Sequence, residues 1–213
     1  MKYKLIVFDL DGTLIDTLSD IQNIFNFVLY SNDFPEKNRL FYKKNIGNGI
    51  EHLLKKCLPN NYSGDFNSLL KFSKIYYDKM LNEKTRVFDG IIPVLEYLKK
   101  NNIKITVVSN KLHLLAIRSV KKYFSSFNID VFGAESGFPR KPNPNSTIHI
   151  IKSNNLLSSE VLFIGDSVVD IQTAKKANIK SAAVLWGNGI KKDFLNYSAD
   201  YILKKPNDIL KVL

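Results

Sequence analysis

The sequence predicts an α/β protein in which a parallel sheet forms the core and an all-helical segment is inserted after the first strand. Three observations support this fold class. The apolar run from Lys4 to Phe8 is rich in branched and aromatic residues, as is typical of a buried strand. Residues 17–85 contain helix-period apolar residues without an intervening strand, whereas short apolar strands alternate with helices after residue 86. We therefore predict an α/β domain formed by 1–16 and 86–213, with a helical domain at 17–85.

Within the inserted segment, the apolar residues recur at helical spacing and are interrupted by turn-forming residues. The first helix follows Asp16 and Thr17, which are typical of a helix start. Breaks at Pro35, at "IGNG" (46–49) and at "PNNYSGD" (59–65) separate the helices that come after it. These further helices are predicted at 36–45, 50–58 and 66–82.

The remainder of the chain alternates between short apolar strands and amphipathic helices, which indicates βαβ units and a parallel sheet. The strand at the start of the chain must join this sheet. The other strands are predicted at 103–108, 129–132, 161–164, 181–185 and 200–203, and the helices at 91–100, 112–124, 144–153 and 168–177.

Composition narrows the class of protein. A length of 213 residues suits a core domain with an insertion. The single cysteine, Cys57, can form neither an internal disulfide nor a thiolate cage for zinc, so we expect a reducing cytoplasm. The apolar run in "MKYKLIVFDLDG" is far shorter than a signal-peptide core or a membrane-spanning helix. We therefore expect a cytoplasmic protein that does not associate with a membrane.

The net charge of +11 raises the possibility of nucleic-acid binding, but the lysines are scattered. Pairs such as Lys43-Lys44 and Lys121-Lys122 lie on the polar faces or ends of predicted helices, without a basic stripe interleaved with aromatic residues. We interpret them as a solvated surface and expect no nucleic-acid partner. A positive field would favour the approach of an anionic, phosphorylated substrate.

Polar clusters follow several of the predicted strands or the loops that leave them. Asp9 and Asp11 come at the end of the first strand. The carboxyl ends of parallel strands meet at one edge of a sheet, so these clusters are expected to converge there. Each cluster alone is explained by an ordinary turn or helix cap, but their joint occurrence is not. The other clusters are Ser109-Asn110, Arg140-Lys141-Pro142 and Gly165-Asp166-Ser167 with Asp170.

Four ordered motifs resemble those of the haloacid dehalogenase superfamily: "DLDGT" (9–13), "SNK" (109–111), "KPNP" (141–144) and "GDSVVDIQTAKKA" (165–177). The resemblance implies a Rossmann-like core with a small helical cap at the position of the insertion. Looser matches in "GNGIEHLL", "FDGI" and "LWGNG" are similar to the phosphoglycolate phosphatase group. Asn178 stands where the family usually has glycine, and we expect it to keep the left-handed turn.

The resemblance implies a Mg²⁺-dependent phosphatase acting on a small phosphorylated metabolite, as a monomer or homodimer. Asp9 would be the nucleophile that forms an aspartyl-phosphate, and Asp11 the general acid and base. Mg²⁺ would be held by the Asp9 carboxylate, the Asp11 main-chain carbonyl and Asp166. Lys141 would neutralise phosphoryl charge, and Asp170 would orient Lys141 or a metal-bound water.

The phosphate-binding residues implied by the resemblance are Ser109, Asn110, Gly12 and Thr13. The Ser109 hydroxyl and the Asn110 N–H, expected at a helix start, would bind a phosphoryl oxygen. Gly12 would allow a tight bend, which the Thr13 hydroxyl would hold. The run from Gly47 to Gly49 either faces the substrate or is a plain turn between helices. We expect the three histidines to be surface or packing residues: His52, His113 and His149.

Several other functions share part of this pattern. A sugar phosphomutase and a nucleotide or pyrophosphate phosphatase would use the same core residues, so only the helical domain distinguishes them. A catalytically silent phosphate-binding module would not need a proton-handling Asp11. A dehalogenase needs neither the second aspartate nor Mg²⁺, and a receiver-type signalling domain would not need the helical insertion. A phosphatase therefore remains the favoured prediction.

Overall fold

A computed structural model describes residues 2–213 and contains the predicted parallel sheet. Six strands lie in the order β5-β4-β1-β6-β7-β8, and every neighbouring pair is parallel. The fold class predicted from the sequence is therefore confirmed. The strands are β1 (Leu5–Phe8), β4 (Lys104–Leu112), β5 (Ile129–Ala134), β6 (Val161–Gly165), β7 (Lys180–Val184) and β8 (Tyr201–Leu203).

Strand β1 lies at the centre of the sheet and is buried on both faces, which explains its uninterrupted apolar sequence. Ile6 and Phe8 pack with helices α5 and α6 on one face, while Leu5 and Val7 pack with helices α7 and α8 on the other. This alternation follows the two-residue period of a strand. The core helices are α5 (Ile91–Lys100), α6 (His113–Phe124), α7 (Asn145–Ser153), α8 (Val168–Lys176) and α9 (Lys191–Asn196), with 3₁₀ turns at Ser158–Glu160 and Pro206–Lys211.

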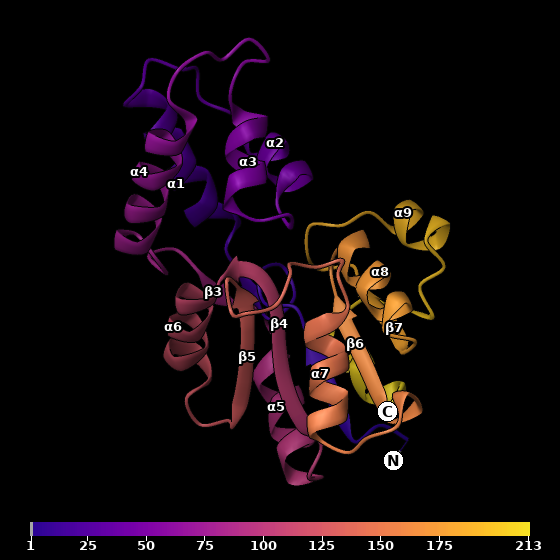
Figure 1. The fold of residues 1–213 in the computed structure, drawn as a ribbon. Coiled ribbons are helices and arrows are strands. Elements are labelled where there is room, and N and C mark those ends of the chain that lie inside the picture. The colour runs from indigo at the N-terminus through magenta and orange to yellow at the C-terminus, as the bar shows by residue number, and fades with distance from the viewer. Residues whose placement is uncertain (1) are drawn as a thin grey trace.

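The inserted segment folds around a second hydrophobic cluster, to which Leu115 of α6 also contributes. Its buried side chains include Phe25, Tyr42, Leu54 and the free thiol Cys57. In Figure 1 these helices lie beyond one end of the sheet, at the opposite end of the molecule from the two chain termini. The helices are α1 (Leu18–Tyr30), α2 (Arg39–Asn45), α3 (Ile50–Cys57) and α4 (Phe66–Lys79).

The two connections between the sheet and the helical segment run side by side. Strand β2 (Ile15–Asp16) pairs in antiparallel fashion with β3 (Arg86–Val87). The buried Asp20 carboxylate, in the first turn of α1, accepts hydrogen bonds from the main-chain N–H groups of Lys84 and Thr85 at 2.7 and 2.9 Å. The chain thus leaves and re-enters the α/β part at one point, and we propose residues 17–85 as the extent of the helical domain.

Some boundaries differ from those predicted. The helix expected at 36–45 begins at Arg39, because the Asn38 side chain accepts a hydrogen bond from the Phe41 N–H and caps it. The helix expected at 66–82 ends at Lys79. Helix α9 and the β2–β3 pair were not predicted, since both are short. Asn178 has φ 56°, so the expected left-handed turn after α8 is confirmed.

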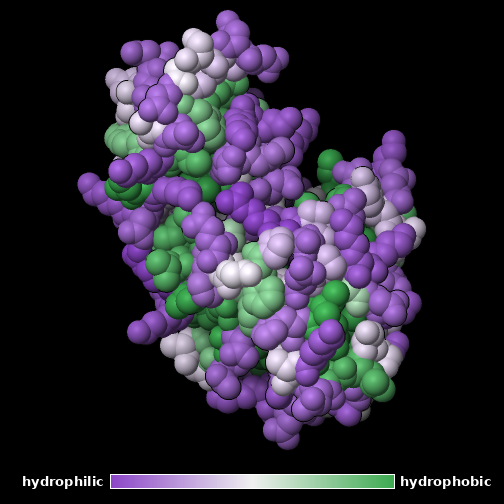
Figure 2. All heavy atoms as spheres, viewed as in Figure 1, coloured by the Kyte–Doolittle hydropathy of each residue, from purple (hydrophilic) through white to green (hydrophobic). Residues whose placement is uncertain are grey.

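Figure 2 shows polar side chains over most of the visible face, and a hollow between the helical domain and the α/β part. No helix formed by residues 2–213 is long and apolar enough to cross a membrane.

Candidate active site

The sequence-predicted polar clusters meet between the sheet and the helical domain. Asp9 directly follows β1, Ser109 lies near the end of β4, and Asp166 directly follows β6. These residues, together with Asp11 and Asn110, line a cavity of about 370 Å³. Its position matches the rule that open α/β sheets bind ligands outside the carboxyl ends of their strands.

Lys141 joins two carboxylates, one of which is the cavity-lining Asp9. Its Nζ lies 2.9 Å from Oδ1 of Asp9 and 2.6 Å from Oδ1 of Asp170, and all three side chains are buried. Burial alone would lower the pKa of Lys141, but the charges of Asp170 and Asp9 outweigh this effect and hold the pKa above its ordinary value. Asp9 Oδ1 also accepts a hydrogen bond from the Leu10 N–H at 2.7 Å, which fixes the direction of the carboxylate.

Three buried carboxylates surround this single lysine. Asp9, Asp166 and Asp170 each place an oxygen within 4.8 Å of the others. Burial raises the pKa of Asp9 to about 7, although Lys141 opposes the shift. Burial, followed by the charges of Asp9 and Asp170, raises the pKa of Asp166 to about 8. One ammonium group cannot balance three carboxylates, so the donor set and its charge fit a divalent cation that prefers oxygen ligands.

Asp170 links the lysine to the helix that follows β6. Its Oδ1 accepts from Lys141, and its Oδ2 accepts from the main-chain N–H and the hydroxyl of Ser167 at 3.0 and 2.6 Å. This second pair of contacts caps the start of α8. The carboxylate is therefore fixed at both oxygens and directs the Lys141 ammonium towards Asp9.

The turn after β1 carries Gly12 and Thr13. Gly12 adopts φ +86°, which glycine reaches without steric cost. Thr13 Oγ1 is buried and has no hydrogen-bond partner within the described chain. The expectation that this hydroxyl holds the turn is therefore wrong. The Thr13 main-chain carbonyl is held instead, by the indole N–H of Trp186 at 3.0 Å.

The placement of Asn110 at a helix start was also wrong. Ser109 and Asn110 belong to β4, and α6 begins at His113, because the strand continues through a register shift between Val108 and Leu112. The Asn110 side-chain amide donates to the main-chain carbonyl of Lys141 at 3.1 Å. It also reaches into the helical domain, where it donates to the carbonyl of Gly47 at 2.9 Å.

That contact bears on the loop between α2 and α3, for which two interpretations were open. Gly47, Asn48 and Gly49 all line the cavity that contains Asp9. A Cβ on Gly49 would lie 3.2 Å from the main-chain oxygen of Asn110, so the loop passes close to β4. The structure favours a loop that faces the site over a plain turn.

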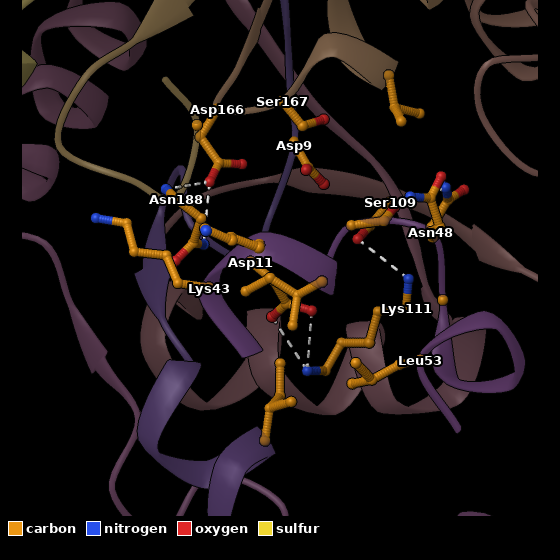
Figure 3. Close-up of a pocket in the computed structure, with 18 of the residues that line it drawn as sticks. Asp9, Asp11, Lys43, Asn48, Leu53, Ser109, Lys111, Asp166, Ser167 and Asn188 are labelled. Atoms are coloured by element: carbon orange, nitrogen blue, oxygen red, sulfur yellow. Dashed lines mark hydrogen bonds and ion pairs between the residues drawn. The ribbon is translucent and has the colours of Figure 1, made fainter. Parts of the chain in front are cut away.

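Three residues of the site were not assigned a role from the sequence. Lys111 and Asn188 lie within quoted motifs, "SNK" and "LWGNG", whereas Tyr77 occupies a helix-period apolar position that gives no functional signal. Asn188 donates to Asp166 Oδ2 from its main-chain N–H and its side-chain amide, at 2.7 and 3.1 Å. Figure 3 shows Asp11 with its carboxylate directed towards Lys111.

The histidines lie away from these groups. His113 Nδ1 accepts a hydrogen bond from the Gly133 N–H at 3.2 Å. The His149 ring packs against Phe138, with ring centroids 5.0 Å apart. None of His52, His113 and His149 lines the cavity.

Comparisons with known proteins agree with the fold. The family model described as haloacid dehalogenase-like hydrolase matches residues 6–184. A phosphoglycolate phosphatase of Aquifex aeolicus is 30% identical, with 99% of this chain and 96% of that protein covered.

Two solved structures are also similar. A predicted phosphoglycolate phosphatase from Haemophilus somnus superposes with a TM-score of 0.91 at 25% identity, covering 100% of this chain and 98% of the other. A haloacid dehalogenase-like family hydrolase from Streptococcus pneumoniae superposes with a TM-score of 0.87 at 25% identity, covering 99% and 98%. The match of the family model, the similarity to a full-length relative and the shared architecture show that the chain belongs to the haloacid dehalogenase-like hydrolases.

Proposed function

We propose that this chain is a Mg²⁺-dependent phosphatase that hydrolyses a small, phosphoglycolate-like phosphomonoester through an aspartyl-phosphate on Asp9. The observation that carries the proposal is the ion pair between Asp9 and Lys141, with Asp11 in the same cavity. A nucleophile, a neutralising cation and a second carboxylate are the groups that hydrolysis of a phosphomonoester requires.

In the proposed reaction, an oxygen of Asp9 attacks phosphorus and the bond from phosphorus to the leaving oxygen breaks. Asp11 gives its proton to the leaving oxygen, and later takes a proton from the water that hydrolyses the aspartyl-phosphate. Among residues 2–213 none donates a hydrogen bond to Asp9 Oδ2, which leaves that oxygen available for attack. Lys141 offsets the negative charge of the phosphoryl group, and Ser109 and Asn110 bind its oxygens.

Asp9, Asp166 and the Asp11 main-chain carbonyl would hold the metal ion. When bound, Mg²⁺ would supply positive charge to the carboxylates and the phosphoryl oxygens. Asp170 is less suited as a direct ligand, because both of its oxygens already accept hydrogen bonds from Lys141 or Ser167.

The rim of the cavity supports a small anionic substrate. Lys43 and Lys44 of α2 line it, and neither forms an ion pair with any residue between 2 and 213. Two free ammonium groups favour a substrate that carries a second negative group, such as a carboxylate, besides the phosphate. We further propose a cytoplasmic location, on the basis of the buried free thiol of Cys57.

The test is phosphate release from a panel of substrates with Mg²⁺: 2-phosphoglycolate, ethyl phosphate, hexose phosphates, nucleotides and pyrophosphate. We expect release from 2-phosphoglycolate to exceed release from ethyl phosphate, which lacks the carboxylate, and to be lost with EDTA. Asp9→Asn should be inactive, whereas Asp208→Asn, a matched change near the C-terminus, should keep wild-type activity. Isomerisation of a hexose phosphate without phosphate release would indicate a mutase, and phosphate binding without turnover would indicate a silent module.

A further inference from the structure

Lys111 is a buried cation that the proposed reaction does not use. Its side chain is 1% exposed, and it extends from β4 between Val108 and Leu112, where the strand shifts register. A buried ammonium group is costly unless charged and polar partners surround it. The identity of those partners therefore indicates what the residue does.

The partners of Lys111 come from both parts of the molecule. Its Nζ donates to Oδ1 and Oδ2 of Asp11 at 3.1 and 3.3 Å, and to the hydroxyl of Tyr77 at 2.8 Å. The same Nζ lies 4.9 Å from the centre of the Tyr77 ring. Tyr77 belongs to α4, and its ring is part of the hydrophobic cluster of the helical domain. Lys111 thus connects a catalytic carboxylate of the α/β part to the helical domain.

The two aspartates that follow β1 are paired with different lysines. Asp9 contacts Lys141 and belongs to the carboxylate group that can hold a metal. Asp11 contacts Lys111, and its carboxylate is not a member of that group among residues 2–213. In Figure 3, Asp11 lies between Asp9 and Lys111, with both carboxylate oxygens directed towards the lysine. The pairing therefore directs the Asp11 carboxylate to Lys111, outside the group formed by Asp9, Asp166 and Asp170.

We infer that Lys111 and Tyr77 are positioning residues for Asp11. Together they hold the Asp11 carboxyl group on the leaving-group side of the cavity, and they couple its orientation to the position of helix α4. The inference rests on the proposed function and deepens it. The proton that Asp11 gives to the leaving oxygen must travel along a defined direction, so a carboxyl group that rotates freely transfers it less efficiently. Because Tyr77 is carried by the helical domain, Asp11 is fully fixed only while that domain contacts the sheet.

The dependence of activity on the leaving group distinguishes a loss of general-acid positioning from a general loss of active-site structure. An alkoxide leaving group, as in 2-phosphoglycolate, needs a proton when its bond to phosphorus breaks. A nitrophenolate, as in p-nitrophenyl phosphate, leaves without one. The parameter kcat/KM covers substrate binding and this first step, whereas kcat also includes hydrolysis of the aspartyl-phosphate, in which Asp11 acts alike for both substrates.

The experiment measures kcat/KM for both substrates with saturating Mg²⁺ in the wild type, Tyr77→Phe, Lys111→Met and the double variant. We expect the ratio of 2-phosphoglycolate to p-nitrophenyl phosphate to fall about tenfold in Tyr77→Phe and about 100-fold in Lys111→Met, within the range of general acid catalysis. In the Lys111→Met background, Tyr77→Phe should change the ratio little further, because Tyr77 acts through Lys111.

Tyr42→Phe is the matched control. Tyr42 is fully buried in the same hydrophobic cluster and donates to Asn26 Oδ1 at 2.6 Å, but it does not line the cavity. Removal of the Tyr42 hydroxyl costs one part-buried hydrogen bond and should leave the ratio unchanged. Thermal unfolding of each variant measures any loss of folded protein.

Two results would overturn the inference. An equal loss on both substrates would mean that Lys111 and Tyr77 support the fold alone, and an unchanged ratio in all variants would mean that Asp11 does not depend on them. A wild-type protein that hydrolyses neither substrate would instead overturn the proposed function, and the inference with it.

Discussion

Gly12 lies so close to Asp166 that a Cβ on Gly12 would be 2.1 Å from Oδ2 of that carboxylate. The same position has φ +86°, which disfavours any side chain. Gly12→Ala must therefore displace Asp166 or the turn that carries Asp11. We expect phosphatase activity to fall at least about 100-fold, the loss associated with displaced catalytic groups, together with weaker Mg²⁺ binding.

Gly137→Ala is the matched control for this change. Gly137 also has positive φ, +88°, but no atom lies within 4 Å of an added Cβ. It should lose only stability, by about 1 kcal/mol. If steady-state kinetics and Mg²⁺ titration showed the same modest effect in both variants, the close approach between Gly12 and Asp166 would have no functional importance.

The contact between Lys141 and Asp170 predicts the effect of a second substitution. Asp170→Asn replaces an acceptor of the Lys141 ammonium and of the Ser167 N–H with a neutral amide. We expect kcat to fall about 10- to 100-fold, as is usual for groups that orient active-site residues. Asp208→Asn is matched, because Asp208 also caps a short helix and pairs with a lysine, Lys211, away from the cavity. Equal kinetics in the two variants would contradict an orienting role for Asp170.

The raised pKa values of Asp9 and Asp166 predict how stability depends on pH. Without metal, the two carboxyl groups hold protons up to about pH 7 and 8 in the folded chain, but only to about pH 4 when unfolded. Between these limits the folded chain binds more protons, so the free energy of unfolding should decrease as pH rises. Thermal unfolding in EDTA should therefore show a lower midpoint at about pH 8 than at about pH 5 from this cause.

Bound Mg²⁺ should replace those protons as the source of positive charge. It should raise the unfolding midpoint more at the higher pH than at the lower one. Asp9→Asn removes one of the two groups and should flatten the pH dependence in EDTA. A magnesium effect that is equal at both pH values would contradict the assignment of these carboxylates as a metal site.

Much of the fold follows from local patterns in the sequence. The helix at 91–100 coincides with the prediction, and the first strand differs only in beginning at Leu5 instead of Lys4, because apolar runs and helical periodicity are local signals. The predicted strand ends at residue 108, whereas β4 extends to Leu112, because the polar residues Ser109 to Lys111 are typical of a loop. The strand nevertheless continues through them to Leu112, which pairs with Ala134 of β5 beyond the register shift, so tertiary context outweighs that local preference.

The site shows the same division. The ordered motifs led to Asp9, Asp166 and Lys141, since residues at strand ends converge in any parallel sheet. Tyr77 could not be found in this way. Its position on α4 resembles a core residue, and only the packing of the helical domain against β4 brings its hydroxyl to Lys111. Contacts between two parts of a chain have no local sequence signature.

The two connections between those parts give the last prediction. The buried Asp20 carboxylate accepts hydrogen bonds from the N–H groups of Lys84 and Thr85 and from the Thr85 hydroxyl. In Asp20→Asn, the side-chain amide can accept fewer of these hydrogen bonds, and its NH₂ group faces N–H or O–H groups that are themselves donors. We expect a loss of about 1–3 kcal/mol in the free energy of unfolding. We also expect faster proteolysis of the connection at residues 83–86, because these hydrogen bonds hold the main-chain N–H groups of Lys84 and Thr85.

Asp78→Asn tests whether this effect is specific to the hydrogen bonds of Asp20. Asp78 pairs with Arg118 and so also joins the helical domain to the α/β part, but both side chains are more than half exposed. Surface ion pairs contribute little, so this variant should lose less than about 1 kcal/mol and keep wild-type proteolysis. Equal destabilisation by the two variants would place the coupling between the domains in their surface charges. A selective effect of Asp20→Asn would place it in the buried hydrogen bonds that close the inserted segment.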